Sequence, residues 1–288
     1  MSAPFLPQRP VVTAYPKMPA AFAEAEAIAA YLIEKGLDVP CGSLYEEDLR
    51  KRIKNGDFDL LIAVGGDGTM LRAGHLCAPC SIPILGINLG RLGFLIQVQS
   101  NEWHDRLDRL FKGEAWIENR MMLRVEHLRA GEIVGSWHAL NEAVVGRGQY
   151  LSPVKLAASA DGHLLTTYIS DGLIAATSTG STAYALAAGG PILPPELRNI
   201  LIVPIAPHLS VDRAVVLAEG SSISIDVKSE NAVLSVDGAV PTGLAEDDRV
   251  DVRAAEYTAQ FVRFGDPGYF YRNLTAHMNQ NPAIGMSR

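Results

Sequence analysis

The stretch Leu60-Leu61-Ile62-Ala63-Val64-Gly65-Gly66-Asp67-Gly68-Thr69 decides the fold of the first part of the chain. Residues 59–64 form a short apolar run bounded by turn residues, as in a strand that a parallel sheet buries on both faces. The run leads directly into a glycine-rich loop. A helix is predicted over 70–76 and a second buried strand over 82–87. This order of strand, loop, helix and strand predicts a doubly wound α/β domain.

Three further helices are predicted around this core. Residues 19–35 form an Ala-rich amphipathic pattern that Gly36 ends, and residues 46–55 form a more polar helix that Gly56 ends. The third helix is predicted over 100–112, with Ser100 as its N-cap.

The pattern changes after about Trp116, where strand-length segments follow one another with turns between them. Turns are predicted at 129–131 and 161–162, and single helices over 181–188 and 269–278. We therefore predict an α/β domain over 1–115, an all-β, sandwich-like domain over 116–265, and a tail of residues 266–288 that packs back on the first domain. The strands predicted in the second domain cover 122–128, 133–139, 154–159, 164–169, 222–228, 232–236 and 250–255.

Composition narrows the class of protein. The chain has 288 residues, 48% of them hydrophobic, which is enough for about two domains with sizeable cores. A net charge of −7 argues against a nucleic-acid or anionic-membrane partner. The N-terminus has no signal-peptide core, and no apolar run approaches the ~18 residues of a membrane span. With three cysteines and a lone CxxC at Cys77 and Cys80, neither a disulfide scaffold nor a zinc site is expected, and we expect a cytoplasmic protein.

The glycine-rich loop at 65–69 has the features of a phosphate site. Glycines let the backbone approach a phosphate, and the N–H groups of the loop and of the following helix bind anions. Asp67 would repel such a ligand, unless it removes a proton from a hydroxyl or holds Mg²⁺ between phosphates. A plain left-handed turn is the alternative. The loop resembles the GGDGT signature shared by NAD kinases, diacylglycerol and sphingosine kinases, and phosphofructokinases, which implies a phosphotransferase.

Two further stretches carry polar or glycine-rich motifs on predicted strands. Residues 84–95 place three glycines after the second buried strand, and Phe94 packs either against a flat ring or in the core. Asn141 and Glu142 interrupt an apolar strand, where adjacent side chains point to opposite faces, so both are functional only if the strand bulges or ends there. A core Asn and a surface Glu are the alternative. The two stretches resemble the GxNxGxLGFL segment and the NE motif of NAD kinases.

The most specific stretch covers residues 170–191. Its Thr and Ser residues and Gly180 precede a predicted helix, which gathers N–H and hydroxyl groups and leaves room for an adenine beside Tyr184; helix capping is the alternative. Asp171 can accept a hydrogen bond from an amino group of a base. The run resembles the DGxxxxTPTGSTAYxLxAGGPI block of NAD kinases, with Ser178 where the family usually has proline.

Weaker matches follow. Residues 203–208 resemble the family's PIxPH segment, which would bring His208 near the transferred phosphoryl group or a substrate phosphate. Asp237-Gly238-Ala239 resembles its DGQ turn with Ala in place of Gln, and residues 270–272 match its FYxxL tail.

These motifs occur in the family's order from about residue 12 to 278. The resemblance implies transfer of a phosphoryl group from ATP or polyphosphate to the 2′-hydroxyl of the adenosine ribose of NAD, with Mg²⁺ or another divalent metal. It implies Asp67 as the general base, a site between the domains, and a homodimer or homotetramer. The residues that it implies in substrate binding are Gly66, Gly68, Thr69, Arg72, Phe94, Asn141, Glu142, Asp171, Thr179, Thr182, Ala183, Tyr184 and His208.

Two other functions stay open. One is a lipid or sugar-phosphate kinase of the same superfamily, against which Asn141, Glu142 and residues 179–184 argue. The other is a non-catalytic NAD- or NADP-binding sensor, against which the presence of Asp67 argues. NAD and NADH remain alternatives as acceptor.

Overall fold

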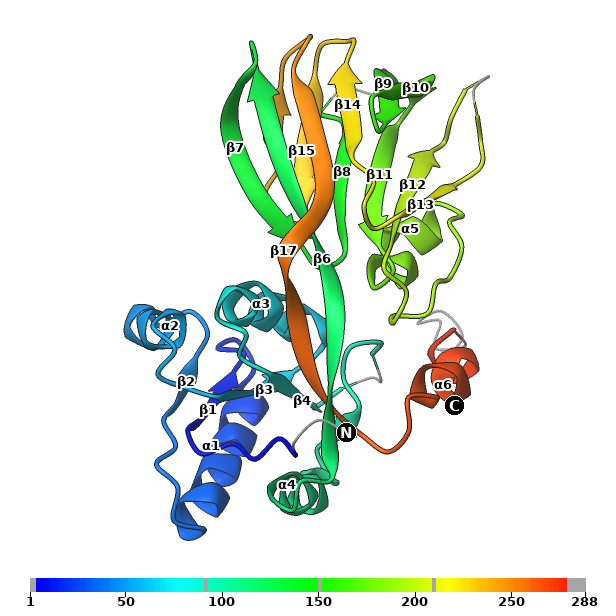
Figure 1. The fold of residues 1–288 in the computed structure, drawn as a ribbon. Coiled ribbons are helices and arrows are strands. Elements are labelled where there is room, and N and C mark those ends of the chain that lie inside the picture. Colours follow the sequence, from blue (N-terminus) through cyan, green and yellow to red (C-terminus); the bar gives the residue numbers. More distant parts are fainter. Residues whose placement is uncertain (1–3, 91–92, 150–151, 209–210, 279–288) are drawn as a thin grey trace, which may run out of the picture. The chain divides into compact units, whose positions relative to one another are not determined.

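The computed structural model describes residues 4–90, 93–149, 152–208 and 211–278. For residues 276–278 it describes the backbone alone. The chain forms two compact units, one of residues 1–119 with 259–288 and one of residues 120–258. Strands β6 (Ala115–Arg129) and β17 (Arg249–Phe264) each pass from one unit into the other. The sequence-based boundaries at 115/116 and 265/266 fall at the start of β6 and just after β17 (Figure 1).

The first unit is built on a parallel sheet in the order β2-β1-β3-β4, with β5 and the last part of β17 also paired to β4. Every residue of β1, β3 and β4 is buried, because helices cover both faces of the sheet. The strands are β1 (Pro10–Ala14), β2 (Cys41–Ser43), β3 (Leu60–Gly65), β4 (Ile84–Asn88) and β5 (Val98–Gln99).

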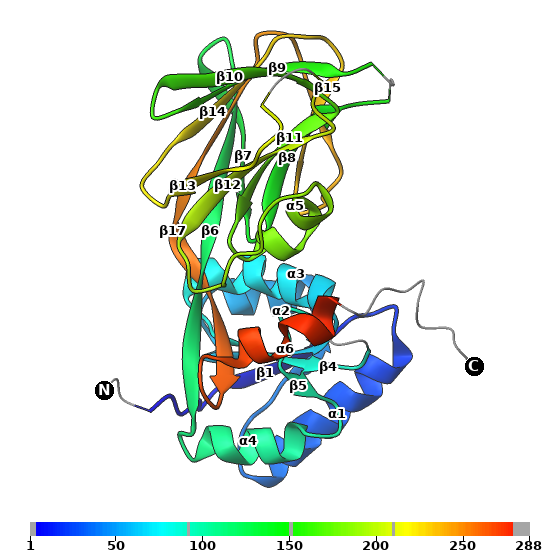
Figure 2. The same ribbon diagram turned by 90° about the vertical axis from the view of Figure 1, so that its right-hand side faces the viewer.

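Helices α1 and α4 lie on one side of this sheet, and α2 and α3 on the other (Figure 1; Figure 2). Ile28 of α1 and Leu107 of α4 join the core with Val12 and Ile62 of the sheet. No helix among the described residues is long and apolar enough to cross a membrane. The helices are α1 (Pro19–Glu34), α2 (Glu47–Lys54), α3 (Asp67–Cys77), the short 3-10 turn η1 (Ala78–Cys80), α4 (Trp103–Phe111) and α6 (Tyr269–Met278).

Most helix predictions in this unit are confirmed, with two corrections. Helix α1 ends as predicted before Gly36, which has φ of +89°. Helix α3 begins three residues earlier than predicted, because Asp67, Gly68 and Thr69 form its first turn. The N-cap prediction for Ser100 is wrong: its N–H donates to the carbonyl of Asn88, and α4 starts only at Trp103. The predicted tail helix matches α6, which belongs to the first unit, whereas residues 279–288 lie outside the described part.

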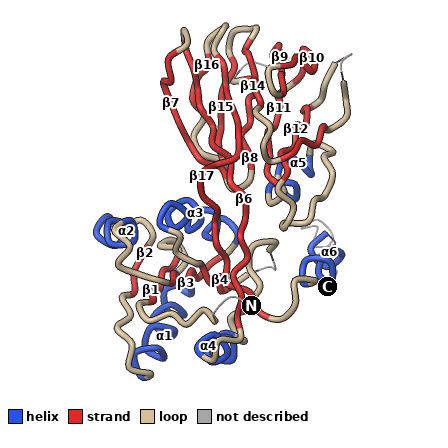
Figure 3. The backbone as a smooth tube through the Cα atoms, in the orientation of Figure 1, coloured by secondary structure: helices blue, strands red, loops and turns tan. Residues whose placement is uncertain are grey.

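The second unit contains two antiparallel sheets, and strands predominate in it (Figure 3). One sheet has the order β13-β12-β11-β8-β15-β16; in the other, β10, β9, β14 and β17 follow one another, with β6 paired to β17 and β7 to β6. Its elements are β7 (Glu132–Ala139), β8 (Glu142–Arg147), β9 (Val154–Ala160), β10 (His163–Ser170), β11 (Gly172–Thr177), η2 (Gly180–Thr182), α5 (Tyr184–Ala187), β12 (Asn199–Ile205), β13 (Val215–Ala218), β14 (Ile223–Val227), β15 (Ala232–Val236) and β16 (Thr242–Leu244).

The sheets of the second unit enclose one apolar core. In β14 and β15 every second residue is buried, which is the alternation of strands with one face on a core. Asp161 and Gly162, with φ of +50° and +79°, form the predicted hairpin turn. The helix predicted over 181–188 is much shorter: after η2 the backbone of Ala183 leaves the helical region, and only Tyr184–Ala187 form α5.

Candidate functional site

The glycine-rich loop of the first unit lies at the carboxyl end of β3, where α/β sheets bind ligands. Gly66 is the N-cap of α3, and its carbonyl accepts hydrogen bonds from the N–H groups of Thr69 and Met70. Gly66 and Gly68 are exposed, Asp67 is half-buried and Thr69 is buried. A helix N-terminus with exposed glycines presents backbone N–H groups to an anion, which suits a phosphate.

Asp67 is held in place by the second glycine-rich stretch. Its carboxylate accepts hydrogen bonds from the N–H of Phe94 at 2.8 Å and from the N–H of Leu95 at 3.2 Å. A Cβ on residue 93 would overlap this carboxylate, so the close approach requires Gly93. The structure thus brings together two motifs that lie 27 residues apart in sequence. Arg91 and Leu92 of this stretch lie outside the described residues.

A buried ion pair supports the segment that holds Asp67. Arg263 of β17 donates from Nη1 to the carbonyl of Leu95 at 2.9 Å and pairs through Nε with Glu118 of β6 at 2.7 Å. Both side chains are nearly buried, at 8% and 13% exposure. The backbone of Leu95 therefore links Arg263, through the Leu95 carbonyl, to Asp67, through the Leu95 N–H. Sequence reasoning missed Arg263, although a charged residue between apolar residues near a strand end was a usable signal.

Two other predicted residues of the first unit are more loosely placed. Arg72, one turn after Gly68, is exposed, and its guanidinium lies 5.9 Å from the ring centroid of Tyr15 and 5.7 Å from that of Tyr45. Its Nη1 lies 3.4 Å from the carbonyl of Gly68. Phe94 is half-buried, so it is neither a free stacking surface nor a core residue.

Asn141 and Glu142 lie where the strand ladder ends, which is the condition under which both can be functional. Strand β7 stops at Ala139 and β8 starts at Glu142. The carboxylate of Asp237 accepts hydrogen bonds from three successive N–H groups, those of Leu140 at 2.6 Å, Asn141 at 2.9 Å and Glu142 at 2.8 Å. We call the turn of residues 140–142 the elbow. Sequence reasoning matched Asp237 to the DGQ turn of the family but did not reveal this contact.

Glu142 is a buried carboxyl group, 8% exposed, whose Oε2 has no hydrogen-bond partner. Burial raises its pKa to about 7, and the nearby Asp237 carboxylate adds to the effect. A hydrogen bond from the backbone N–H of Tyr184 opposes the rise. Through this hydrogen bond the Tyr184 N–H contacts Glu142 of the elbow. Tyr184 directly follows Ala183, where the predicted helix breaks.

The segment after β11 packs directly on the elbow. Thr177 donates from Oγ1 to the carbonyl of Leu140 at 2.6 Å, and its N–H donates to the carbonyl of Asn141 at 2.8 Å. A Cβ on Gly180 would overlap the backbone of Asn141. This packing gathers six of the predicted residues in one region of the second unit: Asn141, Glu142, Thr179, Thr182, Ala183 and Tyr184.

Within this segment the side chains differ in freedom. Thr179 is nearly buried and accepts a hydrogen bond from Nη1 of buried Arg120 at 3.3 Å, while Thr182 donates to the carbonyl of Thr179. Tyr184 is 45% exposed, so its ring is available to a ligand. Arg120 was also missed from the sequence, although it is a charged residue at the start of an apolar strand segment.

Asp171 and His208 are not part of this group. Asp171 precedes Gly172, which pairs with Gly146, whereas Glu142 pairs with Ala176 at the other end of the same ladder. Asp171 is five residues from Ala176, a span of about 17 Å along a strand, which separates Asp171 from the elbow within one chain. The N–H of exposed His208 donates to the carbonyl of Ile169, so His208 lies at the Asp171 end. Within one chain the structure therefore does not bring Asp171 or His208 to the elbow.

The Asp171 end has its own partner, which the sequence did not reveal. Arg147 approaches the Asp171 carboxylate through Nη2 at 3.4 Å, and both side chains are about one-third exposed. The Asp171 carboxylate therefore forms an ion pair with Arg147.

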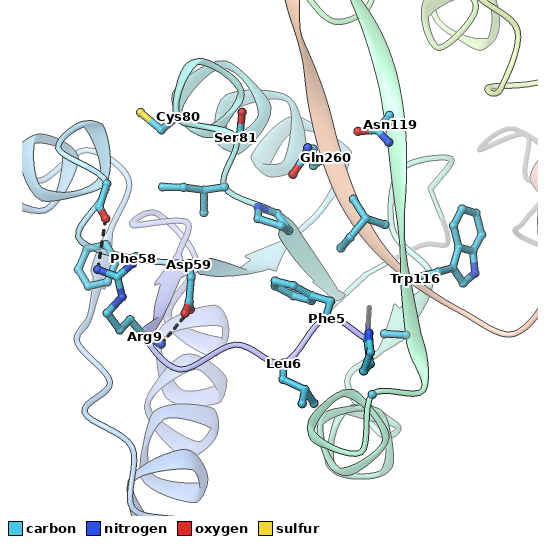
Figure 4. Close-up of a pocket in the computed structure, with 17 residues that line it drawn as sticks. Phe5, Leu6, Arg9, Phe58, Asp59, Cys80, Ser81, Trp116, Asn119 and Gln260 are labelled. Atoms are coloured by element: carbon cyan, nitrogen blue, oxygen red, sulfur yellow. Dashed lines mark hydrogen bonds between the residues drawn. The ribbon is translucent and has the colours of Figure 1, made fainter. Parts of the chain in front are cut away.

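A wide hollow of about 1210 Å³ lies elsewhere in the first unit, at the amino ends of β1, β3 and β4 (Figure 4). Arg9 and Asp59 line it, and the Asp59 carboxylate already accepts the N–H groups of Gln8 and Arg9 at 2.8 Å each. Ligands of α/β sheets bind at the opposite, carboxyl ends of the strands, where the GGDGT loop lies. We therefore do not assign this hollow to the reaction.

The two cysteines of the CxxC have separate environments. Cys77 is fully buried, and burial raises the pKa of its thiol, while the Cys80 thiol lies 3.3 Å from the carbonyl of Lys54. Across the residues that the structure describes, no group of three or more His, Cys, Asp or Glu side chains gathers at metal-binding distances.

Comparison with known proteins agrees with these features. The family model of the ATP-NAD kinase N-terminal domain matches residues 17–115, and that of the C-terminal domain matches residues 140–264. An NAD kinase of Chloroflexus aurantiacus is 36% identical over 275 residues, 95% of this chain and 99% of the relative. An NAD kinase of Symbiobacterium thermophilum is 42% identical over 219 residues, 75% of this chain and 77% of the relative.

Solved structures show the same likeness over nearly the whole chain. A yeast NADH kinase complexed with NADH superposes with a TM-score of 0.83 at 26% identity, covering 98% of this chain and 91% of the other. An NAD kinase of Archaeoglobus fulgidus in complex with ATP gives 0.75 at 27% identity, covering 93% and 98%. With both family models matched in order and relatives aligned over most of its length, the chain belongs to the NAD kinase family.

Proposed function

We propose that this chain transfers the terminal phosphoryl group of ATP to the 2′-hydroxyl of the adenosine ribose of NAD, forming NADP and ADP. The observation that carries the proposal is the carboxylate of Asp67, fixed by two backbone N–H groups at the N-terminus of α3, in a chain of the NAD kinase family. Polyphosphate remains an alternative donor and NADH an alternative acceptor. A cytoplasmic location and a homodimer or homotetramer also remain predictions.

In the proposed reaction Asp67 takes the proton of the ribose 2′-hydroxyl. Each of its oxygens accepts one N–H bond in the structure, and a carboxylate oxygen has a further lone pair for that proton. The freed oxygen attacks the terminal phosphorus of the donor, and the bond from that phosphorus to the bridging oxygen of ADP breaks. Gly66, Gly68 and the first turn of α3 bind the phosphates through backbone N–H groups, with Thr69 and Arg72 beside them.

The elbow region of the second unit is proposed to hold the adenosine half of NAD. The Tyr184 ring lies against the adenine, and Ala183 leaves space for it. Asn141 offers a donor and an acceptor to the polar edge of the base, and Glu142 accepts from a ribose hydroxyl. Thr179 and Thr182 shape the wall. Because Asp171 and His208 lie at the far end of the ladder, they are proposed to contact another part of the substrates.

The residues at the loop fit Mg²⁺ that arrives with the donor. Asp67 is the first residue of α3 at this loop, and no group of three or more metal-binding side chains gathers among the described residues. Mg²⁺ in nucleotide sites takes few protein ligands, keeping water and phosphate oxygens instead. Asp67 is the side chain that would contribute to holding it. When bound, the ion neutralises the phosphate charge.

The test is the substitution Asp67→Asn, with Asp59→Asn as its matched control. Each carboxylate belongs to the first unit and accepts two backbone N–H bonds, but Asp59 lies at the amino end of β3. We expect D67N to lower kcat by ~10²-fold or more, and D59N to leave kcat close to that of the parent. Near-normal turnover by D67N would remove Asp67 from the role of base.

The acceptor is tested on the unmodified protein. NAD, diacylglycerol and fructose 6-phosphate are each offered with ATP and Mg²⁺, and we expect only NAD to be phosphorylated. Phosphorylation of either other acceptor in place of NAD would identify a related kinase. Binding of NAD without NADP formation would identify a sensor.

A further inference from the structure

The proposed function makes no use of the CxxC motif, Cys77-Ala78-Pro79-Cys80. The motif lies where α3 ends and the 3-10 turn η1 follows, shortly before β4. Cys77 is the last residue of α3, and Cys80 is the last residue of η1. The motif therefore closes the helical segment whose first residue is Asp67.

The backbone of this turn places the two cysteine side chains on the same side. Cys77 has φ and ψ of −89° and −30°, and Ala78 has −57° and −43°, so both are helical. The helical path ends only at Ser81, which has φ of +54°. Residues three apart eclipse one another in a 3-10 turn, and their Cβ atoms lie about 5–6 Å apart in an α-helix. A disulfide joins Cβ atoms about 3.5–4.5 Å apart, so a shift of about 1–2 Å is sufficient to form it.

The two thiols differ in their access to solvent. Cys77 is fully buried, whereas Cys80 is half-buried and lines the wide hollow of about 1210 Å³ (Figure 4). Burial raises the pKa of the Cys77 thiol, and the neighbouring Cys80 thiol adds to the rise. A small oxidant therefore reacts with Cys80 first, and Cys77 is protected until it reacts with Cys80.

The Cys80 thiol has a backbone partner when the cysteines are free. Its Sγ lies 3.3 Å from the carbonyl oxygen of Lys54, the last residue of α2. This contact joins η1 to the end of α2. A disulfide with Cys77 would remove the contact, because the bonded sulfur carries no hydrogen to donate.

The place of the motif in the fold argues against a thioredoxin-like activity on other proteins. In such a site the first cysteine stands at a helix N-terminus, which stabilises its thiolate. Here the motif stands at the C-terminal end of α3, where the helix dipole disfavours a thiolate. Among the described residues, no third His, Cys, Asp or Glu joins the pair in a group that could hold a metal ion. An oxidation within the pair itself is the chemistry that remains.

We propose that Cys77 and Cys80 form a reversible disulfide within one chain, with hydrogen peroxide as the oxidant. The Cys80 sulfur attacks one peroxide oxygen, the O–O bond breaks, and Cys80 sulfenic acid and water form. The Cys77 sulfur then attacks the Cys80 sulfur, and the sulfenic oxygen leaves as water with the proton of Cys77. Two thiols are thereby oxidised to one disulfide, and the peroxide is reduced to two molecules of water.

This disulfide would serve regulation rather than stability. It closes a loop of only four residues, so it restricts the unfolded chain little. Exposed or strained disulfides are the labile ones, and a dithiol would return the pair to two thiols. None of these steps involves phosphoryl transfer, so the proposal does not depend on the proposed function.

The test compares the full-length parent with C80S, C77A and, as the matched control, C41S. Cys41 is an exposed cysteine on β2 of the same unit. Trypsin separates the two groups, because Cys41 lies in the peptide of residues 36–50 and the CxxC motif in that of residues 73–91. Each protein is treated with hydrogen peroxide, its remaining thiols are alkylated in denaturant, and both peptides are weighed before and after reduction with dithiothreitol.

The parent and C41S should give a 73–91 peptide that has lost two hydrogens and takes up no alkylating agent until dithiothreitol is added. In C80S, Cys77 should remain an alkylatable thiol. In C77A, the Cys80 sulfenic acid should persist and react with a 1,3-diketone probe. Because C80S and C41S change side chains that are not fully buried, both should fold, and thermal unfolding of the reduced proteins checks this.

Three results would each overturn the proposal. One is a 73–91 peptide that keeps two alkylatable thiols in the parent while Cys41 is oxidised. Another is Cys80 that proceeds to sulfinic acid in the parent as readily as in C77A. The third is a disulfide that joins two chains on a non-reducing gel and disappears in C80S. NADP formation by the reduced parent, measured separately, reports on the proposed function alone.

Discussion

Replacing Glu142 with Gln tests whether the elbow stores an unfavourable buried charge. The Glu142 carboxyl has a pKa of about 7 in the folded chain, against an ordinary value of 4.5, because it is buried and faces Asp237. At about 1.4 kcal/mol for each pH unit, the difference corresponds to about 3 kcal/mol of unfolding free energy. Gln has nearly the same shape and never ionises, so E142Q removes this cost.

The sign follows from proton binding. Below pH 4.5 the carboxyl is protonated in both states, and the charge costs nothing. Between pH 4.5 and about 7 the unfolded chain releases the proton first, so unfolding becomes easier as the pH rises. We expect E142Q and the parent to have similar stability at pH 4.5, and E142Q to be more stable by up to about 3 kcal/mol at pH 8.

Denaturant unfolding at several pH values measures the difference between variant and parent, in which the other titrating groups cancel. Glu256→Gln is the control of opposite sign. A hydrogen bond from its own backbone N–H, and then Arg124, lower the pKa of Glu256 to about 2. E256Q should therefore lose stability at pH 8, and the loss should shrink as the pH falls below 4.5. A gain from E142Q that is the same at pH 4.5 and pH 8, or no gain at either, would refute the reasoning.

Three further predictions concern stability and positioning. Arg263→Met should lower kcat by ~10²-fold through displacement of Asp67, while KM for NAD changes little. Because the two residues should act as one unit, R263M should cause little further loss of kcat in a D67N background. A further loss as large as that in the parent would contradict this prediction. Asp237→Asn should destabilise the chain by about 2 kcal/mol in denaturant unfolding, since one backbone N–H of the elbow then faces an amide. Carbon NMR should also show a lower pKa for Glu142 in D237N; an unchanged value would contradict the role of the Asp237 charge. Tyr168→Phe should leave stability unchanged or raise it by about 1 kcal/mol, because the buried Tyr168 hydroxyl has no partner; a clear loss would contradict this.

Periodicity and turn residues were sufficient to predict much of the fold. The helix that ends before Gly36, the buried run at β3 and the Asp161-Gly162 hairpin depend on local physics, and each was confirmed. Strands β11 and β12 were not predicted: like β3 they show no alternation, but no glycine-rich loop of the β3 kind was used to mark where they end. The residues after 180 have the composition of a helix, so the helix predicted over 181–188 was too long. The break at Ala183 depends on a tertiary contact between the Tyr184 N–H and Glu142, which the composition does not reveal.

The sequence predicted the motifs of the site better than their supports. Gly66, Asp67 and Asn141 were identified because glycine-rich and polar residues stand out at strand ends. The contacts of Asp237 with the elbow and of Arg263 with Leu95 join residues more than 90 positions apart, and no local pattern reveals them. The separation of Asp171 from the elbow likewise depends on strand register, which one sequence does not contain.

Asp67 and Asp237 show how similar contacts leave one carboxylate available for chemistry and use the other for support. Both accept N–H groups from a distant segment and so fix a backbone turn. Asp237 takes three N–H bonds, two of them on Oδ1, and this fills the lone pairs of that oxygen. Asp67 takes one bond on each oxygen, is half-exposed and lies at a helix N-terminus. A proton acceptor needs a fixed orientation and an unfilled lone pair together. Asp67 meets both conditions on each oxygen, which is why we assign it the chemical role and Asp237 the role of holding the elbow.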